Sequence, residues 1–118
     1  MSHILLVEDN IDMQTLLHDL LQWGGHQVSF GRTGEEGMEA LYNAQSLPDL
    51  IISDLTMPAM DGLQLYQAVR QNPNWAHIRF IIMSANPQDE RLQTDEAYGL
   101  NGVLPKPFSL EELQRLLI

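Results

Sequence analysis

The sequence places a small set of chemically active side chains after short apolar segments. The set contains an acidic pair, a third carboxylate, a hydroxyl and the only lysine of the chain: Glu8, Asp9, Asp54, Ser84 and Lys106. The lysine stands alone in the otherwise apolar segment 103–108, a position that requires a reason. Several roles that converge on one place are the mark of a functional site, so we treat the five residues as one candidate site.

The chemistry of such a set follows from charge. Three carboxylates that lie close together repel one another, so either their pKa values rise or a hard divalent cation compensates them. Mg²⁺ suits this role because it binds a few carboxylates, a carbonyl and retained water. A hydroxyl and an ammonium beside it stabilise the oxygens of a transferring phosphoryl group. Asp54 can then be a nucleophile that forms an acyl phosphate, although spacing alone leaves Glu8 and Asp9 open as alternatives.

The elements that position these residues can be read from the apolar pattern. Five short apolar runs are typical of buried parallel strands, and four of them end within two residues of a member of the set. The runs cover residues 3–7, 27–30, 49–53, 80–83 and 103–104. The sequence therefore predicts five strands, four of which carry the candidate site at their carboxyl ends.

Helical patterns lie between these runs. Apolar residues repeat at helical spacing over 13–21, where Gly24 and Gly25 end the helix, and again at 65–69. Residues 33–36 and 109–112 have the composition of capping boxes, each of which opens a helix. The polar segment 88–98 is predicted as the fourth of five helices, although only Leu92, Ala97 and Tyr98 give it an apolar side.

Strands that alternate with helices predict an α/β fold, a single doubly wound five-stranded parallel sheet with five helices. The carboxyl ends of parallel strands share one rim, and ligands bind there. A length of 118 residues fits one domain. The sequence thus predicts that the five candidate residues, far apart along the chain, meet at one edge of the sheet.

Composition and charge exclude several classes of function. A net charge of −10 repels a phosphate backbone, so we expect no direct nucleic-acid binding. No apolar run approaches the roughly 20 residues of a membrane span, the amino terminus is unlike a signal peptide, and cysteine is absent. We therefore expect a cytoplasmic protein without membrane association, disulfides or thiolate metal sites.

The combination of motifs resembles the receiver domain of two-component response regulators, which is CheY-like with a flavodoxin-like fold. The resemblance covers residues 4–117 and rests on four features in family-like order and spacing. They are the pair Glu8-Asp9, the segment 54–62 (Asp-Leu-Thr-Met-Pro-Ala-Met-Asp-Gly), Ser84-Ala85, and Lys106-Pro107-Phe108. It implies that residues 1–118 form one receiver domain and that any output domain lies outside this chain.

The resemblance also implies a role for each site residue. Asp54 would accept a phosphoryl group from a phosphohistidine of a histidine kinase or histidine phosphotransfer protein, in a phosphorelay. Glu8, Asp9, Asp54 and the backbone carbonyl of Thr56 would hold Mg²⁺. Ser84 would bond a phosphoryl oxygen, and Lys106 would pair with the phosphoryl group. The peptide bond between Lys106 and Pro107 is often cis in the family.

Such a domain is a phosphoacceptor switch rather than an enzyme, with only self-directed phosphoryl transfer and autodephosphorylation. Phosphorylation would change the face formed by residues 88–98, 103–104 and the last helix, and so alter partner binding or promote a homodimer. Val103 departs from the family, which carries Tyr or Phe three residues before the lysine as a switch ring, so aromatic switching is not expected here. Thr56 and Asn86 occupy positions that tune the lifetime of the phosphoryl group in the family.

Three alternatives belong to other classes. A Mg²⁺-dependent phosphohydrolase with an aspartyl nucleophile would require a second acid two residues later, where this chain has Thr56. A flavin carrier of the same architecture would require a Ser/Thr/Gly-rich phosphate loop after the first strand, where Glu8, Asp9 and Asn10 stand instead. A binding module without phosphorylation would not need the intact set of five site residues.

Overall fold

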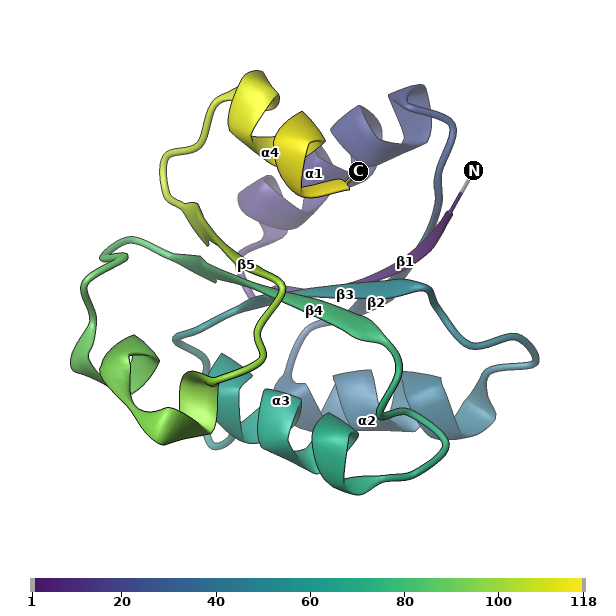
Figure 1. Cartoon of the computed structure of the whole chain (residues 1–118). Helices are drawn as coiled ribbons and strands as arrows, with labels where there is room; N and C mark the ends of the chain where they lie inside the picture. Colours follow the sequence, from purple (N-terminus) through teal and green to yellow (C-terminus); the bar gives the residue numbers. More distant parts are fainter. Residues whose placement is uncertain (1, 118) are drawn as a thin grey trace.

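The computed structural model describes residues 2–117 and contains one parallel five-stranded sheet (Figure 1). The strand order is β2-β1-β3-β4-β5. The chain adds β2 on one side of β1 and the later strands on the other side, and β3 lies at the centre. The strands are β1 (His3–Val7), β2 (Gln27–Gly31), β3 (Leu50–Asp54), β4 (Arg79–Ser84) and β5 (Gly102–Pro105). The predicted strands are all confirmed, with bounds that differ by at most one residue at either end.

Helices cover both faces of the sheet, as the doubly wound prediction requires. Helices α1 (Ile11–Trp23) and α4 (Leu110–Leu117) lie on one face, and α2 (Gly34–Asn43) and α3 (Gly62–Gln71) lie on the other (Figure 1). None of the helices in residues 2–117 combines the length and the apolar character needed to cross a membrane.

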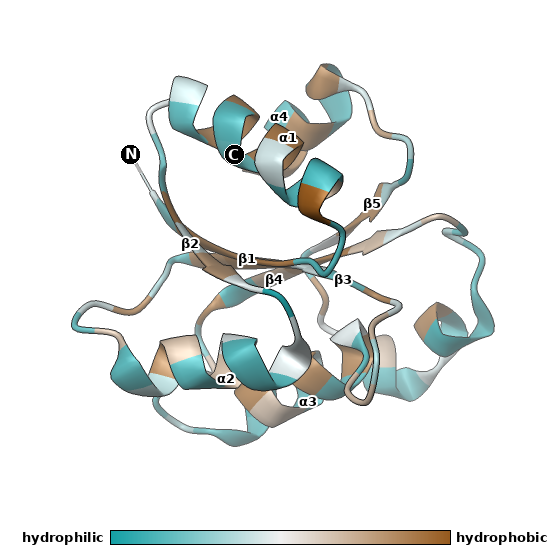
Figure 2. Ribbon diagram, turned by 180° about the vertical axis from the view of Figure 1, so that it is seen from behind, coloured by the Kyte–Doolittle hydropathy of each residue, from teal (hydrophilic) through white to brown (hydrophobic). Residues whose placement is uncertain are grey.

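The sheet separates two hydrophobic cores. Successive side chains of a strand point to opposite faces, so each strand contributes residues to both cores. On β1, Ile4 and Leu6 enter the core under α1 and α4, whereas Leu5 and Val7 enter the core under α2 and α3. Figure 2 shows the apolar strands enclosed between the two helical layers. Burial on both faces explains why these strands are continuous apolar runs rather than alternating ones.

The two predicted capping boxes differ in detail. At the start of α4, Ser109 and Glu112 form the reciprocal pair: each backbone N–H donates to the other's side chain, at 3.0 and 3.1 Å. At the start of α2, the Thr33 hydroxyl accepts from the Glu36 N–H at 3.1 Å, but the Glu36 carboxylate accepts from the Arg32 N–H instead. Both helices therefore begin where the sequence predicts, because their first N–H groups find side-chain acceptors.

The fourth predicted helix is absent as an α-helix, so residues 2–117 contain four α-helices where five helices were predicted. Residues 88–98 form two short 3₁₀ helices, η1 (Glu90–Gln93) and η2 (Asp95–Ala97). The Asp89 carboxylate accepts from the Arg91 N–H at 2.9 Å, and the Thr94 hydroxyl donates to the Arg91 carbonyl at 3.0 Å. Such local side-chain bonds compete with a continuous helix. The apolar side is also short, because Tyr98 is 89% exposed.

The start of α3 packs directly against the end of β3. The Gly62 N–H donates to the Leu55 carbonyl at 2.8 Å. A Cβ atom at Gly62 would collide with the Asp54 carbonyl oxygen and would lie 3.0 Å from the Leu55 Cα. Only a residue without a side chain permits this approach, which holds the loop after Asp54 close to the sheet.

We predict that Gly62→Ala lowers the free energy of unfolding by about 1–3 kcal/mol, because a rigid backbone must yield to the added methyl group. Gly24→Ala is the matched control, since the nearest atom to its added Cβ is a side-chain atom of His26 at 3.3 Å. The control is expected to change stability by less than about 0.5 kcal/mol. Urea unfolding monitored by circular dichroism measures both, and equal effects would contradict the steric explanation.

Candidate functional site

The five residues singled out in the sequence meet at the carboxyl rim of the sheet. Glu8 and Asp9 directly follow β1, Asp54 ends β3, Ser84 ends β4, and Lys106 directly follows β5. Glu8, Asp54 and Ser84 are buried, at 1%, 8% and 4% exposure, whereas Asp9 is exposed. The parallel order of β1, β3, β4 and β5 produces this convergence, because neighbouring strands end at the same edge.

The three carboxylates form one cluster. Glu8, Asp9 and Asp54 each offer an oxygen atom, and these oxygens all lie within 4.8 Å of one another. Carboxylate oxygens at such separations are the donors that a hard divalent cation prefers. Asp9 is exposed and Glu8 is buried, so the cluster borders solvent on the side of Asp9.

Lys106 lies between the two buried carboxylates. Its Nζ atom is 3.2 Å from Glu8 Oε2 and 3.1 Å from Asp54 Oδ2. Burial alone would lower the pKa of Lys106, but the charges and hydrogen bonds of Asp54 and Glu8 outweigh burial and raise it. The ammonium therefore stays charged and stabilises both carboxylates.

The charge of Lys106 does not offset the negative charge of the carboxylates at the rim. Burial raises the pKa of Glu8, and repulsion from Asp54 adds to this rise, while Lys106 opposes it without cancelling it. An additional cation at the rim would relieve the same repulsion. The electrostatics of Glu8 thus agree with the donor set in pointing to a place for a divalent cation.

Ser84 lies at the rim, but its hydroxyl is bonded within its own loop. The hydroxyl donates to the Asn86 carbonyl at 2.7 Å and accepts from the Asn86 N–H at 3.0 Å. It must rotate or move with its loop before it can bond a group on Asp54. The predicted role of Ser84 stays a prediction, while its position beside strand β3, which ends at Asp54, follows from the pairing of β3 with β4.

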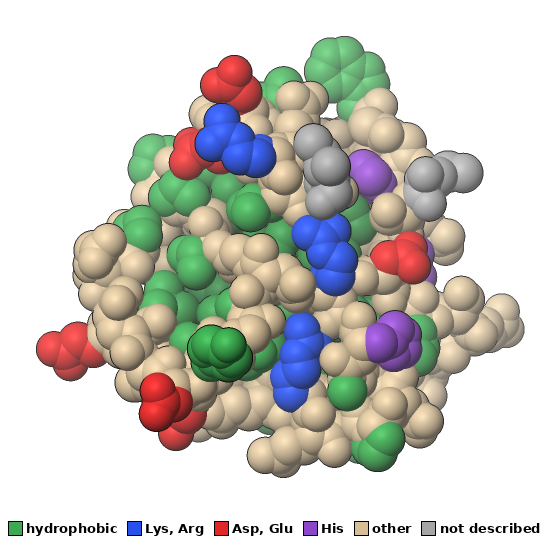
Figure 3. Space-filling view, in the orientation of Figure 1, with side chains coloured by type: hydrophobic (Ala, Val, Ile, Leu, Met, Phe, Trp, Pro, Cys, Tyr) green, Lys and Arg blue, Asp and Glu red, His purple; other side chains and the backbone are tan. Residues whose placement is uncertain are grey.

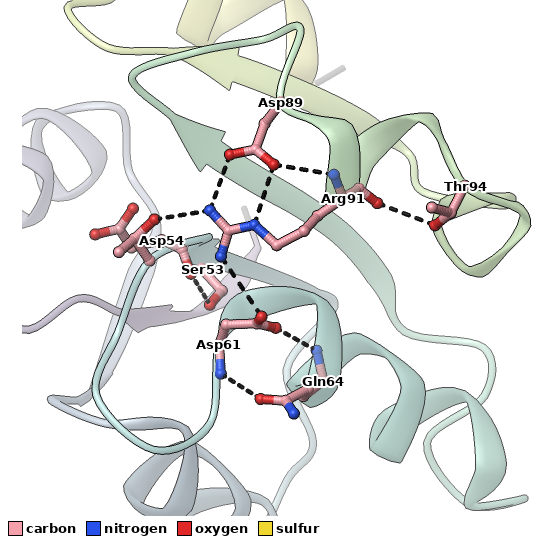
Figure 4. Close-up of polar contacts among 8 residues, drawn as sticks. Ser53, Asp54, Asp61, Gln64, Asp89, Arg91 and Thr94 are labelled. Carbon is pink, nitrogen blue, oxygen red and sulfur yellow. Dashed lines mark hydrogen bonds and ion pairs between the residues drawn. The ribbon is translucent and has the colours of Figure 1, made fainter.

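A cluster around Arg91 on the same rim was missed by sequence reasoning (Figure 4). The guanidinium bonds Asp89 and Thr56 and forms an ion pair with Asp61. Thr56 belongs to the predicted metal-binding loop, and Asp61 caps α3. The spacing of Asp89 and Arg91 was the only local indication, because the other two partners come from a distant part of the chain.

Two further expectations concern β5 and its end. The Lys106–Pro107 peptide bond is cis, as the resemblance implied. Val103, in place of the family's aromatic residue, is half-buried in β5 and pairs in register with Ile82 of β4. Position 103 therefore carries an aliphatic side chain of the sheet, as the sequence requires, and no aromatic ring.

Comparison with known proteins identifies the family to which this fold belongs. The family described as the response regulator receiver domain matches residues 4–118. This chain belongs to that family. The receiver is 38% identical over 112 residues to the probable chemotaxis protein CheY of Rhizobium etli, which covers 94% of this chain and 85% of that protein.

Other relatives place the receiver within longer proteins. It is 38% identical to part of the sensor histidine kinase TmoS of Ectopseudomonas mendocina, covering 94% of this chain and 11% of that one. It is 32% identical to part of the KDP operon transcriptional regulatory protein KdpE of Escherichia coli, covering 99% and 50%. The receiver therefore spans most of one relative and only part of the others.

Solved structures agree with the fold. Chemotaxis response regulator CheY4 of Vibrio cholerae has a TM-score of 0.88 at 31% identity, covering 99% of the receiver and 96% of that chain. The receiver domain of sensor histidine kinase PA1611 from Pseudomonas aeruginosa has a TM-score of 0.86 at 30% identity, covering 98% and 93%. The latter structure holds a magnesium ion in its active-site cleft. The CheY-like, flavodoxin-like fold is confirmed.

We predict that Glu8→Gln raises the thermal unfolding midpoint by a few degrees in metal-free buffer at pH 8. The raised pKa means that the folded state binds the Glu8 proton more tightly than the unfolded state. Glu8 therefore contributes stability below the ordinary pKa of 4.5, and this contribution is lost as the pH rises through the raised value. Differential scanning calorimetry at pH 4 and pH 8 measures the difference, which should vanish at the lower pH.

Glu39→Gln is the control for this prediction, because Glu39 is an exposed carboxylate on α2, away from the rim. It should leave the midpoint nearly unchanged at both values of pH. A Glu8→Gln variant that is less stable than the wild type at pH 8 would show that the pair with Lys106 outweighs burial and repulsion.

Proposed function

We propose that this receiver is a phosphorelay switch in which Asp54 accepts a phosphoryl group from a phosphohistidine. The observation that carries the proposal is the position of Asp54 at the end of the central strand. Its carboxylate is 3.1 Å from the Lys106 ammonium and shares an oxygen cluster with Glu8 and Asp9. A buried nucleophile beside a fixed cation and a metal-binding set is the arrangement that phosphoryl transfer requires.

Mg²⁺ is the proposed cofactor. Glu8, Asp9 and Asp54 would hold it together with the backbone carbonyl of Thr56, which lies in the loop after β3. The fit is supported by the clustered carboxylate oxygens and by the raised pKa of Glu8. When bound, the ion supplies positive charge where phosphoryl oxygens gather.

The chain's own residues would divide the transfer among them. A carboxylate oxygen of Asp54 attacks phosphorus, so an O–P bond forms while the P–N bond to the histidine breaks and the imidazole nitrogen keeps the electron pair. Lys106 already contacts Asp54 and would pair with the new phosphoryl oxygens. The Ser84 hydroxyl would leave Asn86 and bond one of these oxygens, which would draw the loop after β4 inward.

The donor would be a histidine kinase or a histidine phosphotransfer protein, since the family receives phosphoryl groups in this way. The movement of Ser84 would alter the face formed by η1, η2, β5 and α4 and so change the binding of an output domain or effector. Return to the starting state would occur by autodephosphorylation. Under this proposal the receiver transfers the group only to itself and converts no separate substrate.

We predict that intact-mass spectrometry detects one added phosphoryl group after incubation with Mg²⁺ and a small phosphoramidate donor. Asp54→Asn should abolish the adduct, because the amide is not a nucleophile for phosphorus, and a chelator should abolish it in the wild type. Lys106→Met should reduce the yield while leaving Asp54 in place. A persistent adduct in Asp54→Asn would contradict the assignment of the acceptor.

Beryllofluoride provides a second measurement that does not depend on the lifetime of an acyl phosphate. The wild type should bind it with Mg²⁺, and Asp54→Asn should not. If neither a phosphoryl adduct nor a beryllofluoride complex forms in the wild type, the receiver is a binding module that keeps the rim without its chemistry.

We also propose that phosphorylation promotes a homodimer through the η1–η2, β5 and α4 face. This face includes the exposed Tyr98 and the half-buried Val103, and it adjoins the loop that Ser84 would move. Sedimentation velocity should detect a larger species on addition of Mg²⁺ and beryllofluoride, with Asp54→Asn as the control. A monomer under both conditions would contradict dimerisation and leave the phosphoacceptor role intact.

A further inference from the structure

Arg91 connects three separate segments around the candidate site (Figure 4). Its Nε and Nη2 atoms donate to the two carboxylate oxygens of Asp89 at 3.0 and 2.9 Å. Nη2 also donates to the Thr56 hydroxyl at 3.2 Å, and Nη1 lies 3.5 Å from Asp61 Oδ2. One side chain thus joins the loop after β4, the loop after β3 and the start of α3.

The two carboxylates that hold Arg91 are themselves fixed by the backbone. Asp89 accepts from the Arg91 N–H at 2.9 Å. Asp61 and Gln64 form a capping box, in which each side chain accepts the other's backbone N–H at 2.8 and 2.9 Å. The hydrogen bonds from Arg91 lower the pKa of Asp89 to about 2. The guanidinium therefore lies in a preformed cradle, charged and oriented at physiological pH.

An exposed ion pair by itself adds little to the free energy of unfolding. We therefore consider which segments the Arg91 contacts hold together. Arg91 is 39% exposed as a side chain and uses a forked contact, which fixes direction as well as distance. The Nη2 atom of this fork also donates to the hydroxyl of Thr56, whose own carbonyl is the proposed backbone ligand for Mg²⁺. The segment 85–91, which would follow Ser84, is fastened at the same point.

We propose that Arg91 is a positioning residue that holds Thr56 in the orientation for metal binding and restrains the loop that carries Ser84. The proposal deepens the proposed function and rests on it for the role of Thr56. It assigns to Arg91 a control over both Mg²⁺ affinity and the lifetime of the phosphoryl group.

The charge of Arg91 and its proposed positioning role have opposite expected effects on Mg²⁺ affinity, so the two can be told apart by experiment. As a mere positive charge near the rim, Arg91 would repel Mg²⁺, and its neutralisation would strengthen binding. As a positioning residue it favours Mg²⁺, and its loss would weaken binding. Lysine keeps the charge but lacks the planar fork, so Arg91→Lys separates the two effects.

The experiment is titration of Mg²⁺ into the full chain by isothermal titration calorimetry. We expect Arg91→Lys and Arg91→Gln each to weaken binding by about 10-fold, the scale seen when a residue that orients a metal ligand is lost. Arg115→Gln, on the exposed side of α4, makes the same charge change away from the rim and should leave the affinity within about twofold of the wild type. Tighter binding by Arg91→Gln, with Arg91→Lys unchanged, would overturn the proposal.

A double-mutant cycle tests the contact with Thr56 itself. Thr56→Val removes the hydroxyl that Arg91 bonds and keeps the backbone carbonyl. It should weaken Mg²⁺ binding about as much as Arg91→Lys, and the double variant should show little further loss, because both changes break the same contact. Losses that simply add would overturn the link between the two residues. This cycle also provides the test if Arg91→Gln fails to fold.

The lifetime of the phosphoryl group gives the second measurement. In the intact-mass assay, Arg91→Lys should still take up one phosphoryl group but lose it at a rate that differs from the wild type by several-fold, whereas Arg115→Gln should not differ. Absence of any adduct in the wild type would contradict the proposed function alone, and the calorimetric result would still decide on Arg91. An adduct with unchanged Mg²⁺ affinity and lifetime in Arg91→Lys would overturn the inference alone.

Discussion

The structure depends on a single ammonium group that lies between two buried carboxylates. Lys106 contacts both Glu8 and Asp54 in a chain whose net charge is −10, and Asp9 adds a third carboxylate at the same rim. Buried carboxylates without a partner are costly, so the lysine makes their burial possible. It does not balance them, since the pKa of Glu8 is still raised by burial and by Asp54. The rim therefore holds the Asp54 carboxylate beside the lysine, and its negative charge exceeds the positive charge that Lys106 supplies.

The parallel sheet brings these charged residues together at one rim. Strands β1, β3, β4 and β5 end at one edge, and each delivers its polar residue there while its apolar residues enter the two cores. The close approach of Gly62 to the end of β3 brings the loop after Asp54 onto the rim. A sheet with two buried faces thus carries the candidate site at the ends of its strands and at the start of the loops that follow them.

The loop after β4 is held by local polar contacts, whereas the sheet is held by apolar burial. Ser84 bonds its own loop through Asn86, and the segment from 88 to 98 forms two short 3₁₀ helices held by side-chain contacts rather than a continuous α-helix. The Arg91 contacts with Asp89, Thr56 and Asp61 tie this segment to the rim at one point. A segment with few buried residues and a small number of directed polar contacts is suited to a change of conformation. The buried strand β4 and this largely exposed segment therefore meet at Ser84.

The strands, the capped helix starts and the five rim residues can all be predicted from the sequence. Their causes are local or periodic: apolar runs for buried strands, Thr33 and Ser109 for caps, and a common position at strand ends for the polar set. It did not determine the 3₁₀ form of residues 88–98, because the competition between helix and side-chain bonds there is decided by weak contacts of similar size. Nor did it reveal the cradle of Arg91 or the bonding of Ser84 to Asn86. The contact of Arg91 with Thr56 joins residues 35 positions apart. Only the tertiary structure decides such a contact, since its geometry depends on how two loops settle after the sheet has brought their strands together.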